Sequence, residues 1–320
     1  MHRLLTSPAV TLMLTGMLAT PASALNSRTW LSGTGTDTAG CGPIATPCRT
    51  LQYALDNTAT GGEIDVKDSA GYGSVIIGRA ISIIGDGVLA GILAPANGAA
   101  ISINAGASDI IVLRGLTIEG AGVASRGIVV YGGGNLDIAN CVIQGFANVG
   151  GVPGAGSGIV LQPAAGAPFY TIVGTTVSHN AGDGVFFLPV SSSSASTTIV
   201  IDHLTAIDNT YGVDFNDFTG GAATRANISN SVLSKNREAG LKAANTPLKL
   251  AIDNTAADAN AYAGFETLSG AVTIGRSSAS NNGFYGFENS TATLSSYGDN
   301  RLSGNGLGPI YGSNGPATLY

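Results

Sequence analysis

The sequence predicts an all-β protein, a right-handed parallel β-helix solenoid with a short N-terminal capping helix. Two observations carry this prediction. The first is a repeated unit in which an Asn precedes a Gly and a short alternating strand, and the second is a set of apolar residues at a fixed distance from that Asn. One such coil cannot bury its own apolar face, whereas stacked coils bury a continuous core. We therefore expect roughly nine or ten coils, stacked about 4.8 Å apart.

The repeated Asn is clearest in the second half of the chain, where a Gly follows it after three or four residues. The positions are Asn180, Asn209, Asn236, Asn260, Asn282 and a weaker copy at Asn305, with successive separations of 29, 27, 24, 22 and 23 residues. Eight residues before the first five stand Ile172, Ile201, Ile228, Ile252 and Ile274. Asn tolerates the left-handed backbone conformation and its amide can bond to a neighbouring turn. We interpret these asparagines as a structural ladder between coils.

The start of the chain has the features of an exported protein. A basic start, an apolar run from Leu4 to Ala19 and the pattern Ala22-Ser23-Ala24 predict a signal peptide at residues 1–24. We assign residues 25–62 to an N-terminal cap and residues 63–320 to the parallel β-helix, which forms a single domain with the cap. No later segment reaches transmembrane length. The expected location is secreted or periplasmic.

Composition narrows the class of protein further. Charged residues make up 11% of the chain and glycine accounts for 47 of 320 residues, which argues against a helical bundle and for many tight turns. With 14 Lys and Arg against 20 Asp and Glu, the net charge is −6. An acidic chain without a basic cluster is a poor nucleic-acid binder. The oligomeric state stays open.

The cap is expected to contain one helix and one disulfide. Thr46 is the expected N-cap, with Pro47 at the first helical position, and Gly61-Gly62 is expected to end the helix. Leu51, Ala54 and Leu55 would form its apolar face, and residues 63–66 would begin the first strand. An oxidising compartment would let Cys41 and Cys48 pair, the alternative being two free thiols. Cys141 is expected to be a small buried hydrophobe rather than a reactive thiol.

A family resemblance appears in the cap. Residues 47–55, reading PCRTLQYAL, then 61–66, reading GGEIDV, and then 71–73, reading GYG, resemble the N-terminal cap of pectate-lyase-like right-handed β-helix proteins. The resemblance extends through the repeats over nearly the whole chain after residue 24. It implies the fold but no particular activity, because this superfamily includes lyases, hydrolases, epimerases and non-catalytic proteins. The catalytic motifs of polygalacturonases, alginate epimerases and pectate lyases are absent, so no catalytic residue is transferred.

Ionisable residues recur at one outward strand position. Residues directly after the repeat Gly should point inward, so the next position should point outward. That second position holds Phe186, Asp214, Lys242, Glu266 and Glu288 in successive coils.

The last four of these are candidate catalytic residues. Lys242 could be the base of uronate β-elimination, with Ca²⁺ held by the adjacent carboxylates. Alternatively, Glu266 and Glu288 about 5 Å apart would match a retaining glycosidase pair. The alternative without a catalytic role, which we favour, is a solvated charge ladder of Asp214, Lys242 and Glu266. Whether the protein binds any other metal stays unknown from the sequence.

Longer loops could form the side of a groove on the same coils, at residues 147–157, 163–169, 189–197 and 217–224. Candidate binding residues beside it are Tyr131, Gln162, Phe186 and Asn216, although Phe186 could instead pack beneath residues 191–194.

Two classes of function follow. We favour an exported β-helix protein with a non-catalytic surface or extracellular role in carbohydrate binding or structure. The alternative is a polysaccharide lyase or glycoside hydrolase acting on acidic (uronate) glycans. A polysaccharide is the candidate partner in both, no cofactor is certain, and Ca²⁺ is the one cation that the alternative could require.

Overall fold

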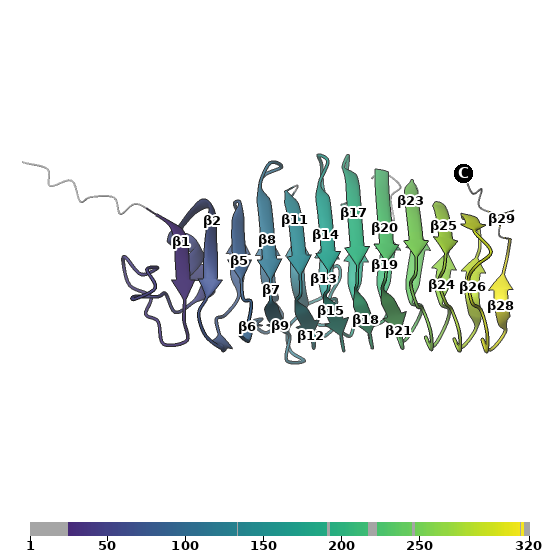
Figure 1. Cartoon of the computed structure of the whole chain (residues 1–320), viewed down its shortest axis with the longest axis horizontal. Coiled ribbons are helices and arrows are strands. Elements are labelled where there is room, and N and C mark those ends of the chain that lie inside the picture. Colours follow the sequence, from purple (N-terminus) through teal and green to yellow (C-terminus); the bar gives the residue numbers. More distant parts are fainter. Residues whose placement is uncertain are drawn as a thin grey trace, which may run out of the picture.

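The computed structural model describes residues 25–132, 134–190, 193–216, 223–244, 247–313 and 315–316. The predicted signal peptide at 1–24 and parts of the 189–197 and 217–224 loops lie outside these residues. The described chain forms a rod of stacked coils (Figure 1), and each coil contributes strands to parallel sheets. The right-handed parallel β-helix is confirmed.

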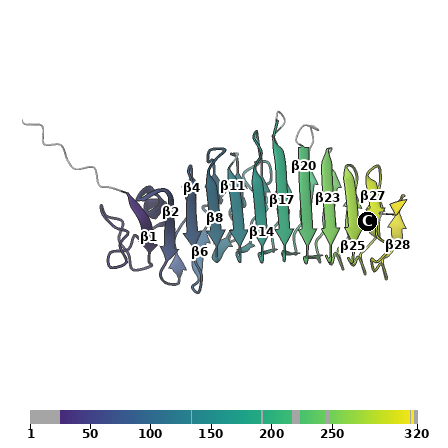
Figure 2. The same ribbon diagram turned by 45° about the horizontal axis from the view of Figure 1, so that its top comes forward.

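Three sheets run along the rod, and all their strand pairs are parallel within the described residues. Sheet A comprises β1 (Asn26–Leu31), β2 (Thr58–Val66), β5 (Ile81–Ile84), β8 (Ile110–Arg114), β11 (Asn135–Ala139), β14 (Phe169–Val173), β17 (Ser196–Asp202), β20 (Ala223–Ser229), β23 (Leu248–Asp253), β25 (Ala271–Gly275), β27 (Thr293–Ser296) and β29 (Gly315–Pro316). Sheet B comprises β3 (Ala70–Gly71), β6 (Ala90–Leu93), β9 (Leu116–Glu119), β12 (Val142–Gln144), β15 (Thr176–Ser178), β18 (Thr205–Ile207) and β21 (Val232–Ser234). Sheet C comprises β4 (Val75–Ile77), β7 (Ala99–Ile103), β10 (Arg126–Val130), β13 (Ile159–Leu161), β16 (Val185–Phe187), β19 (Val213–Asn216), β22 (Leu241–Ala244), β24 (Phe265–Thr267), β26 (Tyr285–Asn289) and β28 (Gly308–Tyr311). Figure 2 shows strands of sheet A side by side in chain order.

The core fills the inside of the coils. The five isoleucines of the repeat are all buried there, as the sequence predicts. The residues directly after the repeat glycines, Val185, Val213, Leu241, Phe265 and Phe287, are buried as well. Aromatic rings stack between neighbouring coils, with ring centroids 6.1 Å apart for Phe187 and Phe215 and 5.5 Å apart for Phe265 and Phe287.

The asparagine ladder lies at the corner between sheets B and C. The Asn236 amide N–H donates to Asn260 Oδ1 over 2.9 Å, and Asn260 Nδ2 donates to the Leu233 carbonyl over 3.1 Å. Equivalent bonds join the other ladder members, so the ladder is confirmed. The left-handed conformation, however, belongs to the residue before each Asn, such as Ala259 with φ 58°. Expecting it at the asparagines themselves was wrong.

The cap differs from the prediction in its boundaries. Helix α1 spans Leu51–Asp56 and its N-cap is Thr50, not Thr46, because the Thr50 side chain accepts from the Tyr53 amide and Asp37 holds Thr50 in place. The helix ends at Asn57, before the two glycines. Leu51, Ala54 and Leu55 are buried as expected. Sheet A starts earlier than residue 63, because β1 pairs in parallel with β2.

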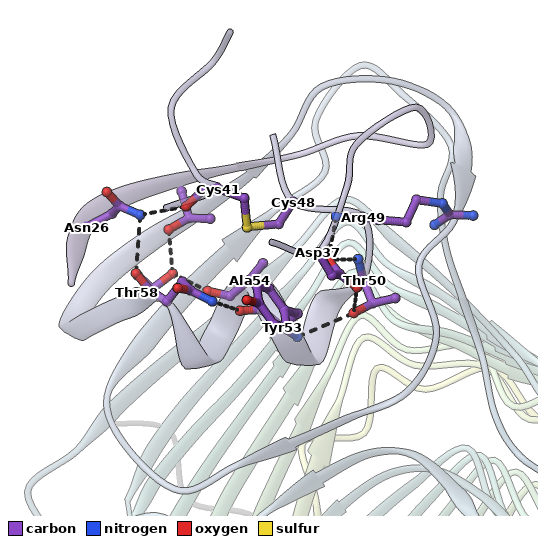
Figure 3. The surroundings of a disulfide bond; sticks show 11 residues. Asn26, Asp37, Cys41, Cys48, Arg49, Thr50, Tyr53, Ala54 and Thr58 are labelled. Carbon is purple, nitrogen blue, oxygen red and sulfur yellow. Dashed lines mark hydrogen bonds between the residues drawn. A yellow bond between two sulfur atoms is a disulfide. The ribbon is translucent and has the colours of Figure 1, made fainter. Parts of the chain in front are cut away.

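Cysteines 41 and 48 form a disulfide beside this helix (Figure 3), with Cα atoms 5.1 Å apart. That separation lies within the range that a disulfide spans without backbone movement. Cys141 is free and buried. Burial raises the pKa of its thiol to about 11, which keeps it in the unreactive thiol form.

No helix among the described residues is long and apolar enough to cross a membrane.

Candidate functional site

The outer surface of sheet C carries the predicted ionisable residues in one row. Parallel pairing places Asp214 opposite Lys242, Lys242 opposite Glu266, and Glu266 opposite Glu288. Paired positions in neighbouring coils are about 4.8 Å apart. We call Asp214, Lys242, Glu266 and Glu288 the charged row. It crosses β19, β22, β24 and β26. Figure 1 labels β19, β24 and β26 along the rod.

The charged row is not solvated, in contrast to the favoured expectation. Asp214 is 3% exposed and Glu266 is 9% exposed, and the Lys242 side chain is 17% exposed. Outward-pointing side chains on a flat sheet cover one another, and flanking aromatic residues add to that cover. The row is therefore a set of largely desolvated charges rather than a surface ladder.

Two tyrosines at the corner before sheet C contact the row. Lys242 Nζ lies 3.4 Å from Asp214 Oδ2 and 4.8 Å from the centroid of the Tyr211 ring. The Tyr262 hydroxyl donates to Glu288 Oε1 over 2.8 Å. The Tyr262 ring also contacts the ring of Phe284, with centroids 4.8 Å apart.

Three carboxyl oxygens in the row lack a hydrogen-bond donor. Asp214 Oδ1, Glu266 Oε2 and Glu288 Oε2 are buried and have no partner among the described residues. A buried oxygen without a donor costs about 1–3 kcal/mol, and more if the group is charged. Such groups in a folded protein call for an explanation, for example a catalytic role or a bound water or ion.

Burial shifts the proton affinity of these carboxyl groups. It raises the pKa of Asp214 to about 7, an effect that the Lys242 ammonium opposes and that nearby Asp183 adds to. Burial likewise raises the pKa of Glu266 to about 7, again opposed by Lys242, while Glu288 raises it further. Asp183, at the corner before β16, has its pKa raised to about 6 by burial. Near neutral pH, Asp214 and Glu266 are each partly protonated.

The four predicted binding residues have different surroundings. Tyr131 is exposed and lies beneath the Arg126 guanidinium, whereas Gln162 and Asn216 are buried. Phe186 is only 8% exposed and packs with Val129 and Val160 in a small apolar cluster outside the coil. Phe186 therefore belongs to an apolar cluster and is not exposed as a candidate binding residue would be.

The 147–157 loop explains the burial of Phe186. A Cβ atom on Gly154 would lie 2.9 Å from Val160 Cγ2 and 3.2 Å from Phe186 Cδ1, and Gly154 has φ +73°. Only glycine fits such a close approach with a left-handed backbone. This loop therefore covers the apolar part of the outer surface of sheet C and leaves the charged row beside it. The expected packing of Phe186 beneath residues 191–194 falls partly outside the described residues.

Metal binding has little support in this row. Within the described ranges, no group of three or more His, Cys, Asp or Glu side chains could hold a metal ion. Lys242 stands between Asp214 and Glu266, so an ammonium occupies the position where a third carboxylate would be needed. The Ca²⁺ alternative thus finds no ligand set in the described part of the row.

Sequence reasoning missed the flanking residues Asp183, Tyr211, Tyr262 and Phe284. All four stand one or two residues before the Gly that opens a sheet C strand. Their place just before that Gly is the signal that could have found them.

The three parallel sheets define the class of protein, which is a right-handed parallel β-helix. Residues 55–247 match the family model described as "right handed beta helix region", and the chain belongs to this family.

Solved structures with the same fold include an alginate lyase from Paenibacillus sp. str. FPU-7. It has 14% identity and a TM-score of 0.57 over 83% of this chain and 96% of the other. Pectate lyase Pel9A has 16% identity and a TM-score of 0.55 over 92% of this chain and 80% of the other. At these identities the likeness is one of fold. No curated protein matches the chain.

Proposed function

We propose that this chain is an exported β-helix protein that binds a polysaccharide along the charged row of sheet C. The observation that carries the proposal is the set of three buried carboxyl oxygens without donors, next to aromatic rings. Sugar hydroxyl groups supply the missing donors, and the apolar faces of sugar rings stack on aromatic side chains. Coils spaced about 4.8 Å apart would offer a polymer lying along the rod a similar set of groups at each step.

The accessible side of the row supports an approach from solvent. Phe284 is 42% exposed, and Glu288, Tyr211 and Tyr262 are partly exposed. A sugar stacked on Phe284 would contact Tyr262 and Glu288 first. Glu266 is 9% exposed, so its contact with a sugar would require neighbouring side chains to shift, which is an induced fit.

Export rests on two features. The pattern at residues 1–24 predicts a signal peptide, and the Cys41–Cys48 disulfide is of the kind that persists in oxidising compartments.

Binding to a panel of oligosaccharides by calorimetry tests the proposal. Glu288→Gln should weaken binding about tenfold, because it removes the charge from a hydrogen bond to the ligand. Tyr262→Phe should weaken binding less, because it removes the hydroxyl that orients the Glu288 carboxylate. Glu63→Gln on sheet A is the matched control and should bind like the wild type. Absence of binding to any neutral, cationic or acidic oligosaccharide would refute the proposal.

A second candidate function is glycoside hydrolysis by Glu266 and Glu288. It is favoured by the raised pKa of Glu266, about 7, which keeps a general acid protonated, and by Tyr262, which orients the neighbouring Glu288. Glu266 would protonate the glycosidic oxygen while the Glu288 carboxylate attacks the anomeric carbon. Water, deprotonated by Glu266, would then cleave the resulting ester.

Reducing-end assays separate hydrolysis from binding. A hydrolase should release new reducing ends, and Glu266→Gln should abolish that release while oligosaccharide binding persists. The lyase alternative instead predicts unsaturated products that absorb ultraviolet light and disappear in Lys242→Ala. In the structure Lys242 is engaged by Asp214 and the Tyr211 ring, which favours its role as a counter-ion. Binding without either product supports the non-catalytic function.

A further inference from the structure

Charges around the row are strongly unbalanced. Besides burial, Asp183, Asp214, Glu238 and Glu266 raise the pKa of Tyr211, and Glu238, Glu266 and Glu288 raise that of Tyr262. Lys242 is the cation of the row. Arg237 acts on Asp183, but among the described residues it forms no ion pair with a member of the charged row. Its guanidinium donates to the Asn180 carbonyl over 2.6 Å and to Thr210 Oγ1 over 3.0 Å.

The order of charges along the row leaves one step without a cation. Asp214, Lys242 and Glu266 alternate in sign, but Glu266 is followed directly by Glu288. Like charges on directly paired strand positions destabilise a sheet. No ion pair within the described residues involves Glu266 or Glu288, and each of the two has a buried oxygen without a donor.

Lys242 illustrates what kind of group such a position holds. Its ammonium sits beside one carboxylate and over the ring of Tyr211. The next coils repeat this combination, with Glu266 and Glu288 as carboxylates and the contacting rings of Tyr262 and Phe284 as the aromatic wall. Cations are attracted to aromatic faces, and most strongly where water is partly excluded.

Building on the proposed binding function, we infer that the ligand is an amino glycan whose free ammonium group binds between Glu266 and Glu288. Its ammonium would complete the alternation of charge and supply donors to the unpartnered oxygens. A uronate glycan would instead bring carboxylates to a surface already rich in them, and that repulsion strengthens where the dielectric constant is low. The structure thus favours cationic over acidic polysaccharides.

Three hexasaccharides of equal length test this inference by calorimetry: a fully de-N-acetylated glucosamine hexamer, its N-acetylated counterpart and a hexauronate. The amine hexamer should bind at least about tenfold more tightly than the N-acetylated hexamer, because a charge-assisted hydrogen bond is lost on acetylation. Its affinity should fall with added salt, and the hexauronate should not bind.

Variants locate the ammonium. Glu288→Gln should remove most of the preference for the amine hexamer, and exposed Glu238→Gln should reduce it severalfold without endangering the fold. Glu63→Gln is the control, and circular dichroism verifies that each variant is folded.

Equal affinity for amine and N-acetylated hexamers, or tighter binding of the hexauronate, would overturn the inference while the proposed binding function stands. Binding of none of the three would overturn the inference and count against the function itself. A preference that survives Glu288→Gln would refute the placement between Glu266 and Glu288.

Discussion

At each corner of the asparagine ladder, two adjacent residues have different roles. The residue before each asparagine adopts the left-handed conformation that turns the chain, as Ala259, Lys235 and Asp208 do with φ 58°, 59° and 56°. The side chain of the asparagine itself forms hydrogen bonds to other coils. Substituting one of the two residues at a time therefore tests backbone strain and side-chain hydrogen bonding separately.

Replacing Ala259 with glycine tests the strain. A left-handed alanine costs roughly 1–2 kcal/mol, of which glycine's larger unfolded-state entropy cancels a part. We expect Ala259→Gly to raise the free energy of unfolding by about 0.5–1 kcal/mol in urea titrations. Ala263→Gly, at a buried position without a left-handed backbone, should lower it. A loss of stability in both variants would contradict this explanation.

Replacing Asn260 with alanine tests the ladder. The change leaves the Asn236 amide and the Leu233 carbonyl without their side-chain partners in the interior of the corner. We expect a loss of about 2–4 kcal/mol in the free energy of unfolding, since each abandoned group costs about 1–3 kcal/mol. Asn227→Ala, at an exposed position of β20, should change stability by less than about 0.5 kcal/mol. Equal effects of the two substitutions would mean that the ladder adds little.

The ladder was predictable from the sequence because one residue type recurs in register. The left-handed position was not, because His, Asp, Lys, Ala and Asn all occur there and no shared residue type marks it. Burial keeps asparagine at one place while the exposed turn next to it tolerates many side chains.

At the scale of elements, the cap depends on contacts between distant parts of the sequence. Asp37 accepts from the Arg49 amide over 2.7 Å and from the Thr50 hydroxyl over 2.7 Å (Figure 3), which fixes the start of α1. Local capping patterns pointed to Thr46 because they ignore a carboxylate more than ten residues away. Strand β1 was missed for a similar reason, since its partner β2 lies about one coil further on.

Removing the disulfide tests how far it stabilises the cap. The bond closes a short loop and restricts the unfolded chain, so Cys41→Ser with Cys48→Ser should lower the free energy of unfolding by about 2 kcal/mol. Cys141→Ala serves as a control for loss of a cysteine outside the cap. Mass analysis of exported protein should find Cys41 linked to Cys48 and Cys141 reduced. Free thiols at both cap positions in that material would refute the pairing.

Over the whole molecule, the outer surface of sheet C changes character along the rod. The 147–157 loop covers the apolar cluster around Phe186, and the charged row begins on the next coil. Alternation along a strand predicted which side chains point outward, and the register placed the charged residues in one row. It did not predict their burial, because burial depends on loops and on neighbours two coils away.

That burial should make stability depend on pH. The folded-state pKa values of Asp214 and Glu266, about 7, and of Asp183, about 6, lie above those of unfolded carboxyl groups, near 4. The folded state therefore holds protons that the unfolded state releases, so the free energy of unfolding should fall as pH rises from about 4 to 7 and level off above that. Each unit of pKa difference corresponds to about 1.4 kcal/mol.

Urea titrations at pH 5, 6, 7 and 8 measure this dependence. Asp214→Asn should reduce the slope, because an amide stays neutral in both states, while Glu266 and Asp183 keep the rest of it. Glu63→Gln on sheet A should leave the wild-type slope. Asp202 acts in the opposite sense: hydrogen bonds from Asn230, Ser229 and His203 lower its pKa to about 2, so its contribution is lost only as pH falls from about 4 toward 2. The window from pH 5 to 8 thus isolates the buried carboxyls. Wild-type stability that rises with pH across it would mean that these groups are solvated and ionised in the folded protein.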